Sequence, residues 1–205
     1  DIDAFEASFA EWQARCMEGV PPLDKGYGER LPQMMATARN VRWAGTGELP
    51  AIPWTTSCRG LILVVGLWAG VSGDVIALLA LGYRLVALCA ECDDRAIQTA
   101  ARALPEVVWV EYVEHVNMNL FKSLAAKRKL AGIVLGGGSP CQGQTFLNKA
   151  RKGMKDPRSL QAYHVERLRR EHAADPQLRE VPLFCHLENV ASMPTESVKC
   201  YSDIL

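Results

Sequence analysis

Cys141, Glu188 and Asn189 are the residues of this chain whose types and neighbours could do chemistry. Cys141 follows Ser139-Pro140 at the end of an apolar, glycine-rich run, and proline fixes the backbone just before the thiol. Glu188 ends a second apolar run, where removal from water would favour its protonated form. A thiolate beside a proton-donating carboxyl could attack an electron-poor ring and protonate it elsewhere.

Cys141 could instead be a small buried residue, half of a disulfide or a metal ligand. The chain has seven cysteines and no secretory signal at its start, which favours reduced thiols over a disulfide framework. Cys89 and Cys92 have CxxC spacing, but no second CxxC or histidine pair completes a zinc site. We therefore predict no metal site, and a buried residue and a nucleophile both remain open for Cys141.

A second group of residues could hold an adenosine-containing cofactor. A glycine-containing turn follows the apolar run 61–66, and Glu91 ends the next apolar run. Such a turn lets a ligand approach the backbone where a helix begins, and the acid can accept hydrogen bonds from both ribose hydroxyls. Glycines in such turns also serve packing, so it is the combination with Glu91 that indicates a cofactor.

Strands that alternate with helices would position all of these residues. Apolar runs predict strands over 61–66, 83–91, 107–113, 131–137 and 181–189. Periodic and capped segments predict helices over 70–82, 93–104, 117–130 and 157–172. This alternation is typical of an open, mostly parallel α/β sheet flanked by helices. Ligands sit beyond the carboxyl ends of the strands in such sheets, so the glycine turn, Glu91, Cys141 and Glu188 should meet at one edge.

Residues 1–60 show a different pattern. An amphipathic helix is predicted over 3–19, while 20–60 has prolines, glycines and isolated aromatic residues without a clear period. We therefore divide the chain into an N-terminal extension, 1–60, and a catalytic core, 61–205. The chain lacks an initiator Met, and we expect it to be a piece of a longer protein.

The composition limits the partners that the chain can have. The net charge is zero and 22% of the residues are charged, so a nucleic acid would have to contact a local patch. Such a patch follows Cys141, at Lys149, Arg151, Lys152 and Lys155, and we predict that it contacts a nucleic-acid backbone. Residues 165–172 also carry cations, and for them nucleic-acid contact and a solvated helix face are equal alternatives. No apolar run has the length and composition of a membrane span, so no membrane partner is expected.

The motifs resemble those of the cytosine-5 DNA methyltransferases. The stretches "GGGSPCQG" and "LFCHLENVASM" are similar to the Pro-Cys and Glu-Asn-Val motifs of that family. "VVGLWAGVSG" resembles its first, S-adenosylmethionine-binding motif, and "ALCAECDDRAI" resembles its second. The de novo, animal-type branch is the most similar. The resemblance covers about 61–205 and implies the Rossmann-like fold of S-adenosylmethionine-dependent methyltransferases.

The resemblance also implies a role for each matching residue. Cys141 matches the nucleophile that adds to C6 of a flipped-out cytosine, and Glu188 matches the acid that engages N3 and the exocyclic amine. Asn189 and Pro140 match residues that hold the base pocket. The implied cofactor site comprises Trp68, Ala69, Gly70, Val71, Gly73, Glu91, Cys92 and Tyr112.

The chain departs from the family pattern at several places. Gly66 replaces the Asp or Ser at the start of the first motif, and Tyr112 replaces the third-motif Asp that meets the adenine amine. Gln142 after Pro-Cys is typical of bacterial and maintenance enzymes rather than of the de novo branch. The arginine motif, target-recognition region and closing motif of the family follow Glu-Asn-Val, and we expect this C-terminal part to be missing here.

The sequence therefore predicts methyl transfer from S-adenosylmethionine to C5 of cytosine in DNA, through a covalent adduct of Cys141. A tRNA substrate is an alternative, because the missing recognition region would decide between the two. A catalytically inactive module that binds DNA or a protein partner is a second alternative, against which the presence of both Cys141 and Glu188 argues. The expected location is the nucleus in a eukaryote and the cytoplasm otherwise.

Overall fold

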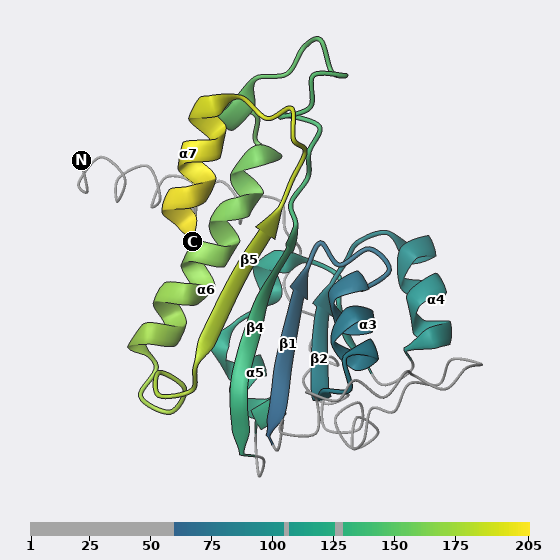
Figure 1. Ribbon diagram of the computed structural model, residues 1–205, viewed down its shortest axis with the longest axis vertical. Helices are drawn as coiled ribbons and strands as arrows, with labels where there is room; N and C mark the ends of the chain where they lie inside the picture. The colour runs from purple at the N-terminus through teal and green to yellow at the C-terminus, as the bar shows by residue number, and fades with distance from the viewer. Residues whose placement is uncertain (1–59, 105–106, 126–128) are drawn as a thin grey trace.

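The computed structural model describes residues 60–104, 107–125 and 129–205, shown in colour in Figure 1. The helix predicted over 3–19, and the extension to which it belongs, lie outside the described residues. The division between extension and core therefore stays a prediction.

The described core is built on one parallel sheet. Its strand order is β3-β2-β1-β4-β5, and every neighbouring pair runs parallel. The strands are β1 (Leu61–Leu67), β2 (Arg84–Ala90), β3 (Val108–Val110), β4 (Leu130–Gly138) and β5 (Leu183–Glu188). Because β1 and β4 are neighbours at the centre, the glycine turn after β1 and the Cys141 segment after β4 leave the sheet side by side.

Helices cover both faces of this sheet (Figure 1). They are α3 (Gly73–Ala80), α4 (Asp94–Ala103), α5 (Met118–Ala125), α6 (Tyr163–Ala174) and α7 (Thr195–Ile204), with the 3-10 turns η2 (Val113–His115), η3 (Gly153–Lys155) and η4 (Ser159–Ala162). None of the helices in the described ranges has the length and apolar character needed to cross a bilayer.

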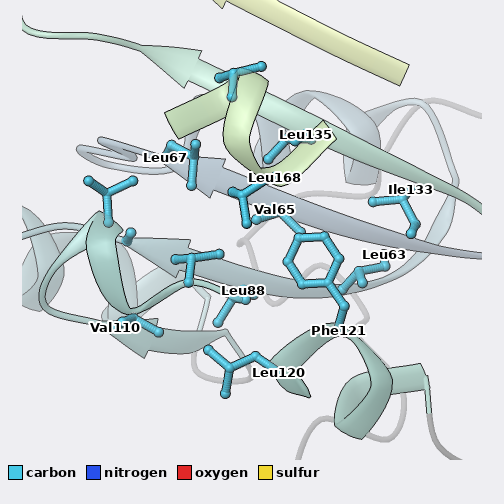
Figure 2. Close-up of a cluster of buried hydrophobic side chains, with 14 of the residues drawn as sticks. Leu63, Val65, Leu67, Leu88, Val110, Leu120, Phe121, Ile133, Leu135 and Leu168 are labelled. Atoms are coloured by element: carbon cyan, nitrogen blue, oxygen red, sulfur yellow. The ribbon is translucent and has the colours of Figure 1, made fainter. Parts of the chain in front are cut away.

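The alternation of side chains along the central strands separates two cores. Leu63, Val65 and Leu67 of β1 pack with α5, α6 and α7, and Figure 2 shows Phe121 of α5 lying over this side. Val64, between them in sequence, packs with α3 on the opposite face. Burial on both faces explains why "LILVV" is a continuous apolar run.

Several predicted helix starts are confirmed by their capping bonds. The Asp93 side chain accepts the N–H of Arg95 at 2.9 Å, and the Asn117 side chain accepts the N–H of Asn119 at 3.0 Å. These bonds satisfy N–H groups that have no partner within the first helical turn.

Three elements show the largest differences from the prediction. The third strand ends at Val110, because Val113–His115 turns into η2. The helix predicted from residue 157 begins only at Tyr163, after η4. Helix α7 was not predicted, although its buried residues Ser197, Tyr201 and Ile204 have helical spacing.

Candidate functional site

The turn between β1 and α3 has an unusual backbone. Trp68, Gly70 and Ser72 all have left-handed φ angles, of 52°, 52° and 60°. Glycine adopts this conformation at no steric cost, whereas tryptophan and serine need support from their surroundings. The Ser72 hydroxyl, which is buried, donates to Cys89 Sγ at 3.4 Å, and the Ala69 N–H donates to the Ala90 carbonyl at 2.9 Å. Both bonds fix the turn to β2.

Glu91, directly after β2, lies against this turn as predicted. Its Oε2 accepts the N–H of Gly70 at 2.8 Å. Its Oε1 accepts the N–H groups of Cys92 and Asp93, each at 2.9 Å. The carboxylate is therefore held in one orientation by three backbone donors, one in the β1–α3 turn and two in the residues that follow Glu91.

A cavity of about 290 Å³ opens at the carboxyl ends of β1, β2 and β3. Its lining residues are Trp68, Ala90, Glu91, Cys92, Glu111, Tyr112, Val113, Glu114, Pro140 and Gln161. Four of the predicted cofactor residues, Trp68, Glu91, Cys92 and Tyr112, are among them. The other four, Ala69, Gly70, Val71 and Gly73, belong to the adjoining turn and helix start and do not line the cavity.

The cavity wall contains carboxylates and no lysine or arginine. Besides Glu91 it has Glu111 and Glu114, which the sequence did not indicate as site residues. The Glu111 side chain hydrogen-bonds Tyr112 and raises the pKa of that phenol. A cavity with this lining favours a ligand that is neutral or cationic over an anionic one.

Glu114 is held from behind by η4 and α6. Its Oε1 accepts Nε2 of Gln161 at 3.3 Å and lies 3.5 Å from Nε2 of His164. Burial alone would raise the pKa of Glu114, but hydrogen bonds from His164, from a backbone N–H and from Gln161 outweigh it and lower the pKa. Glu114 is therefore a carboxylate at neutral pH, and no local sequence signal connects it to partners that are 47 or more positions away.

His164 is a neutral partner in this contact. Burial lowers its pKa, although Glu114 opposes that shift. Arg167 Nε donates to His164 Nδ1 at 3.3 Å, which leaves the histidine proton on Nε2, facing Glu114.

The nucleophile candidate follows β4. The Cys141 side chain is half-buried, and the residues before it are fixed by a hydrogen-bonded cluster. Asn189 Nδ2 donates to the Ser139 carbonyl at 3.2 Å, to Ser139 Oγ at 3.0 Å and to the Tyr201 hydroxyl at 3.1 Å. Ser139 Oγ and the Tyr201 hydroxyl are 2.7 Å apart. The structure thus places Asn189 beside the segment that leads to Cys141 and adds Tyr201, which the sequence did not indicate.

Two of the glycines before Cys141 are required by close approaches. Gly137 has a φ of 148°, and a side chain there would collide with the Leu67 carbonyl of β1. A Cβ on Gly136 would collide with the His186 carbonyl of β5. The glycine run therefore lets β4 pass close to both neighbouring strands just before the thiol.

Glu188 is next to the nucleophile segment, because it pairs in register with Gly138. The expectation that it lies in a buried strand end is wrong. Strand β5 is at the edge of the described sheet, and its residues alternate between half-buried and exposed, with Glu188 on the exposed side. Neither Cys141 nor Glu188 lines the cavity, whereas Pro140 does.

The basic segment after Cys141 contains cations in two kinds of environment. Lys149, Lys152 and Lys155 are exposed. Arg151 Nη1 instead donates to the carbonyls of Gln144 at 3.2 Å and Ser192 at 2.9 Å. Arg151 therefore ties the loop to the segment after β5.

Comparison with known proteins adds evidence on the fold. No family model and no curated protein matches the sequence. Among solved structures, the Entamoeba histolytica methyltransferase EhMeth superposes with a TM-score of 0.50 and 17% identity, over 71% of this chain and 43% of that protein. A TehB-like S-adenosylmethionine-dependent methyltransferase from Corynebacterium glutamicum superposes less well, with a TM-score of 0.34 and 13% identity over 100% of this chain and 84% of that protein.

The match to the Entamoeba protein spans less than half of that protein, and its low identity bears on the fold alone. The superposition is consistent with the parallel sheet described above. The described core of this chain therefore has a Rossmann-like α/β fold, similar to that of the Entamoeba methyltransferase.

Proposed function

We propose that this chain transfers a methyl group from S-adenosylmethionine to C5 of cytosine in DNA, with Cys141 as the nucleophile. One observation carries the proposal. The cavity that is lined by four of the predicted cofactor residues is also lined by Pro140, the residue next to Cys141. A cofactor in that cavity and a base at the thiol would therefore be neighbours.

The cavity residues fit the proposed cofactor. Glu91, fixed by three backbone N–H groups, can still accept a hydrogen bond from a ribose hydroxyl. The Trp68 ring and the surrounding carboxylates suit the positive sulfonium group. When bound, S-adenosylmethionine supplies an electrophilic methyl group.

Cys141 and Glu188 would prepare the base for that group. The Cys141 thiolate adds to C6 of cytosine, and the electron pair of the C5–C6 double bond moves toward C5. Glu188 engages N3 and the exocyclic amine, which draws negative charge from the ring. After methylation, loss of the C5 proton and departure of the thiolate restore the aromatic ring. Because Glu188 is exposed in the described chain, we expect the bound base itself to cover its carboxyl.

The loop after Cys141 supports a nucleic acid as the substrate. Phe146 and Leu147 expose 64% and 78% of their surface at this loop, between the thiol and the exposed lysines Lys149 and Lys152. Apolar side chains flanked by cations suit unstacked bases beside a phosphate backbone. A target base must leave the stack before C6 becomes accessible. A DNA substrate would place the protein in the nucleus of a eukaryotic cell.

The proposal is tested by trapping with duplex DNA in which every cytosine is replaced by 5-fluorocytosine, so that no target sequence need be known. Fluorine at C5 cannot leave as a proton does, and the adduct persists. We expect a covalent complex, resistant to denaturing gels, that requires S-adenosylmethionine and disappears in Cys141→Ser. The matched control is Cys200→Ser, on α7, which should retain the complex.

The outcomes separate the candidate functions. A complex with 5-fluorocytidine tRNA and none with DNA would favour the tRNA alternative. Binding of S-adenosylmethionine without an adduct on either nucleic acid would contradict the proposal and favour an inactive binding module.

A further inference from the structure

Tyr201, on α7, contacts the nucleophile segment from 62 positions further along the chain. Its hydroxyl is 2.7 Å from Ser139 Oγ and 3.1 Å from Asn189 Nδ2. Ser139 and Tyr201 expose only 3% and 7% of their surfaces. Buried hydroxyls in such a cluster have fixed positions, because each would be left without its partner if it moved.

The orientation of Asn189 is also fixed. Its Oδ1 accepts the N–H of Val190 at 2.8 Å, so Nδ2 must face the two hydroxyls and the Ser139 carbonyl. That carbonyl belongs to the peptide bond with Pro140. The cluster therefore acts on the backbone immediately before Cys141.

The same segment of chain restrains the other side of the nucleophile loop. Ser192 Oγ accepts the N–H of Phe146 at 3.2 Å, and the Ser192 carbonyl accepts Arg151 Nη1 at 2.9 Å. Residues on both sides of Cys141 thus form hydrogen bonds with the segment 189–201. Of the residues in that segment that make these bonds, Tyr201 is the one on α7.

The packing of α7 does not itself require the hydroxyl. The Tyr201 ring belongs to the apolar core together with Ile204, and a phenylalanine would fill the same space. What the hydroxyl adds is its pair of contacts to Ser139 and Asn189.

We propose that Tyr201 is a positioning residue for Cys141: its hydroxyl holds Ser139 and Asn189 so that the thiol keeps one orientation toward the base. The proposal rests on the proposed function in that it takes Cys141 as the nucleophile. Tyr201 does not touch the reacting atoms, and its effect passes through the Ser139–Pro140 backbone.

The test is Tyr201→Phe in the full chain. Misplacement of a reacting group by a fraction of an ångström to an ångström slows its reaction by about ten- to a hundredfold. We expect kcat for DNA methylation to fall about tenfold while the KM for S-adenosylmethionine stays within about twofold. Ser139→Ala should have a similar effect, and the double variant should be little worse than either single one, because both remove the same hydrogen bond.

The matched control is Ser202→Ala. Ser202 is the next residue on α7, and its hydroxyl donates to the Val198 carbonyl of its own helix at 3.0 Å. This variant should leave kcat unchanged. Equal kcat values for Tyr201→Phe and Ser202→Ala would overturn the proposal.

A second measurement does not depend on methylation. Alkylation of Cys141 by iodoacetamide, followed by peptide mass spectrometry, should become at least about threefold faster in Tyr201→Phe, because the half-buried thiol is released. Cys200, one residue before Tyr201, is the internal reference and should not change. If the ratio of the Cys141 alkylation rate to the Cys200 alkylation rate is unchanged in Tyr201→Phe, the positioning role is overturned, even if the wild-type protein methylates DNA. A changed ratio in a protein that forms no adduct would instead contradict only the proposed function.

Discussion

At the scale of single residues, the contact between Glu91 and the β1–α3 turn fixes part of the wall of the cavity. Both carboxylate oxygens accept backbone N–H groups, from Gly70 on one side and from Cys92 and Asp93 on the other. A carboxylate has about four lone pairs, so it can accept from all three of these N–H groups and still accept from one ribose hydroxyl. An amide at the same position cannot, because one of its two groups is a donor.

We predict that Glu91→Gln weakens S-adenosylmethionine binding by about 10- to 100-fold, the loss expected for hydrogen bonds to a charged acceptor. Isothermal titration calorimetry would measure the dissociation constant. Glu180→Gln, whose carboxylate is 85% exposed and outside the cavity, is the control and should bind as the wild type does. Unchanged binding in Glu91→Gln would exclude Glu91 from the cofactor site.

Site residues were predictable where the sheet itself determines their position. Glu91 and Cys141 each follow a strand of a parallel sheet, so the pattern of apolar runs was enough to bring them to one edge. Glu114 was not predictable, because its role depends on burial by η4 and α6. The environment of Glu188 was predicted wrongly, because an apolar run does not show whether its strand lies at the centre or the edge of a sheet.

At the scale of elements, helix α6 holds the cavity wall through His164. The histidine is buried between Glu114 of η2 and Arg167 of its own helix. Both His164 and Glu114 have pKa values below their ordinary values of 6.5 and 4.5. The folded chain therefore binds fewer protons at these groups than the unfolded chain does.

We predict that the free energy of unfolding falls as the pH is lowered through 6.5 and below. A group whose folded pKa is depressed contributes stability that is complete above its unfolded pKa and diminishes as the pH falls. Denaturant titrations between about pH 7.5 and about pH 5.5 should show a smaller decrease in His164→Gln than in the wild type. His186→Gln, on the exposed side of β5, should show the wild-type decrease, and equal decreases in all three proteins would contradict the prediction.

The elements themselves were predictable to different degrees. The strands around β1 are long apolar runs, and helices α4 and α5 begin at the capping residues Asp93 and Asn117. Helix α7 was missed because it buries only three residues and has no side-chain cap. That omission concealed Tyr201, and with it the cluster that fixes the nucleophile segment.

At the scale of the whole molecule, any attraction to nucleic acid must be local, because the chain has no net charge. Lys149, Lys152 and Lys155 are exposed on the loop and turn that follow Cys141. Arg151 is different, because its guanidinium already donates to two backbone carbonyls. Only the three lysines are therefore expected to bind phosphates.

We predict that replacing Lys149, Lys152 and Lys155 with alanine lowers the salt dependence of DNA binding. The slope of log K against log salt should become less negative by about 0.9 for each phosphate that the variant no longer neutralises, or about 2.7 for all three lysines. Fluorescence anisotropy at several salt concentrations would measure it. Alanine at the exposed cations Arg84, Arg95 and Arg102 is the control, and an equal change there would show that the effect is one of net charge alone.

The β1–α3 turn, with its left-handed φ angles, also affects which nucleotides the cavity can bind. Helix starts after the first strand of such sheets commonly bind phosphates, through free N–H groups. Here Gly70 donates to the carboxylate of Glu91, and Asp74 accepts the N–H of Val75 at 2.9 Å. The protein's own carboxylates thus take the place of a diphosphate, and Glu111 and Glu114 would repel one. A dinucleotide such as NAD should therefore be excluded from a cavity that still accepts a nucleoside carrying a positive charge.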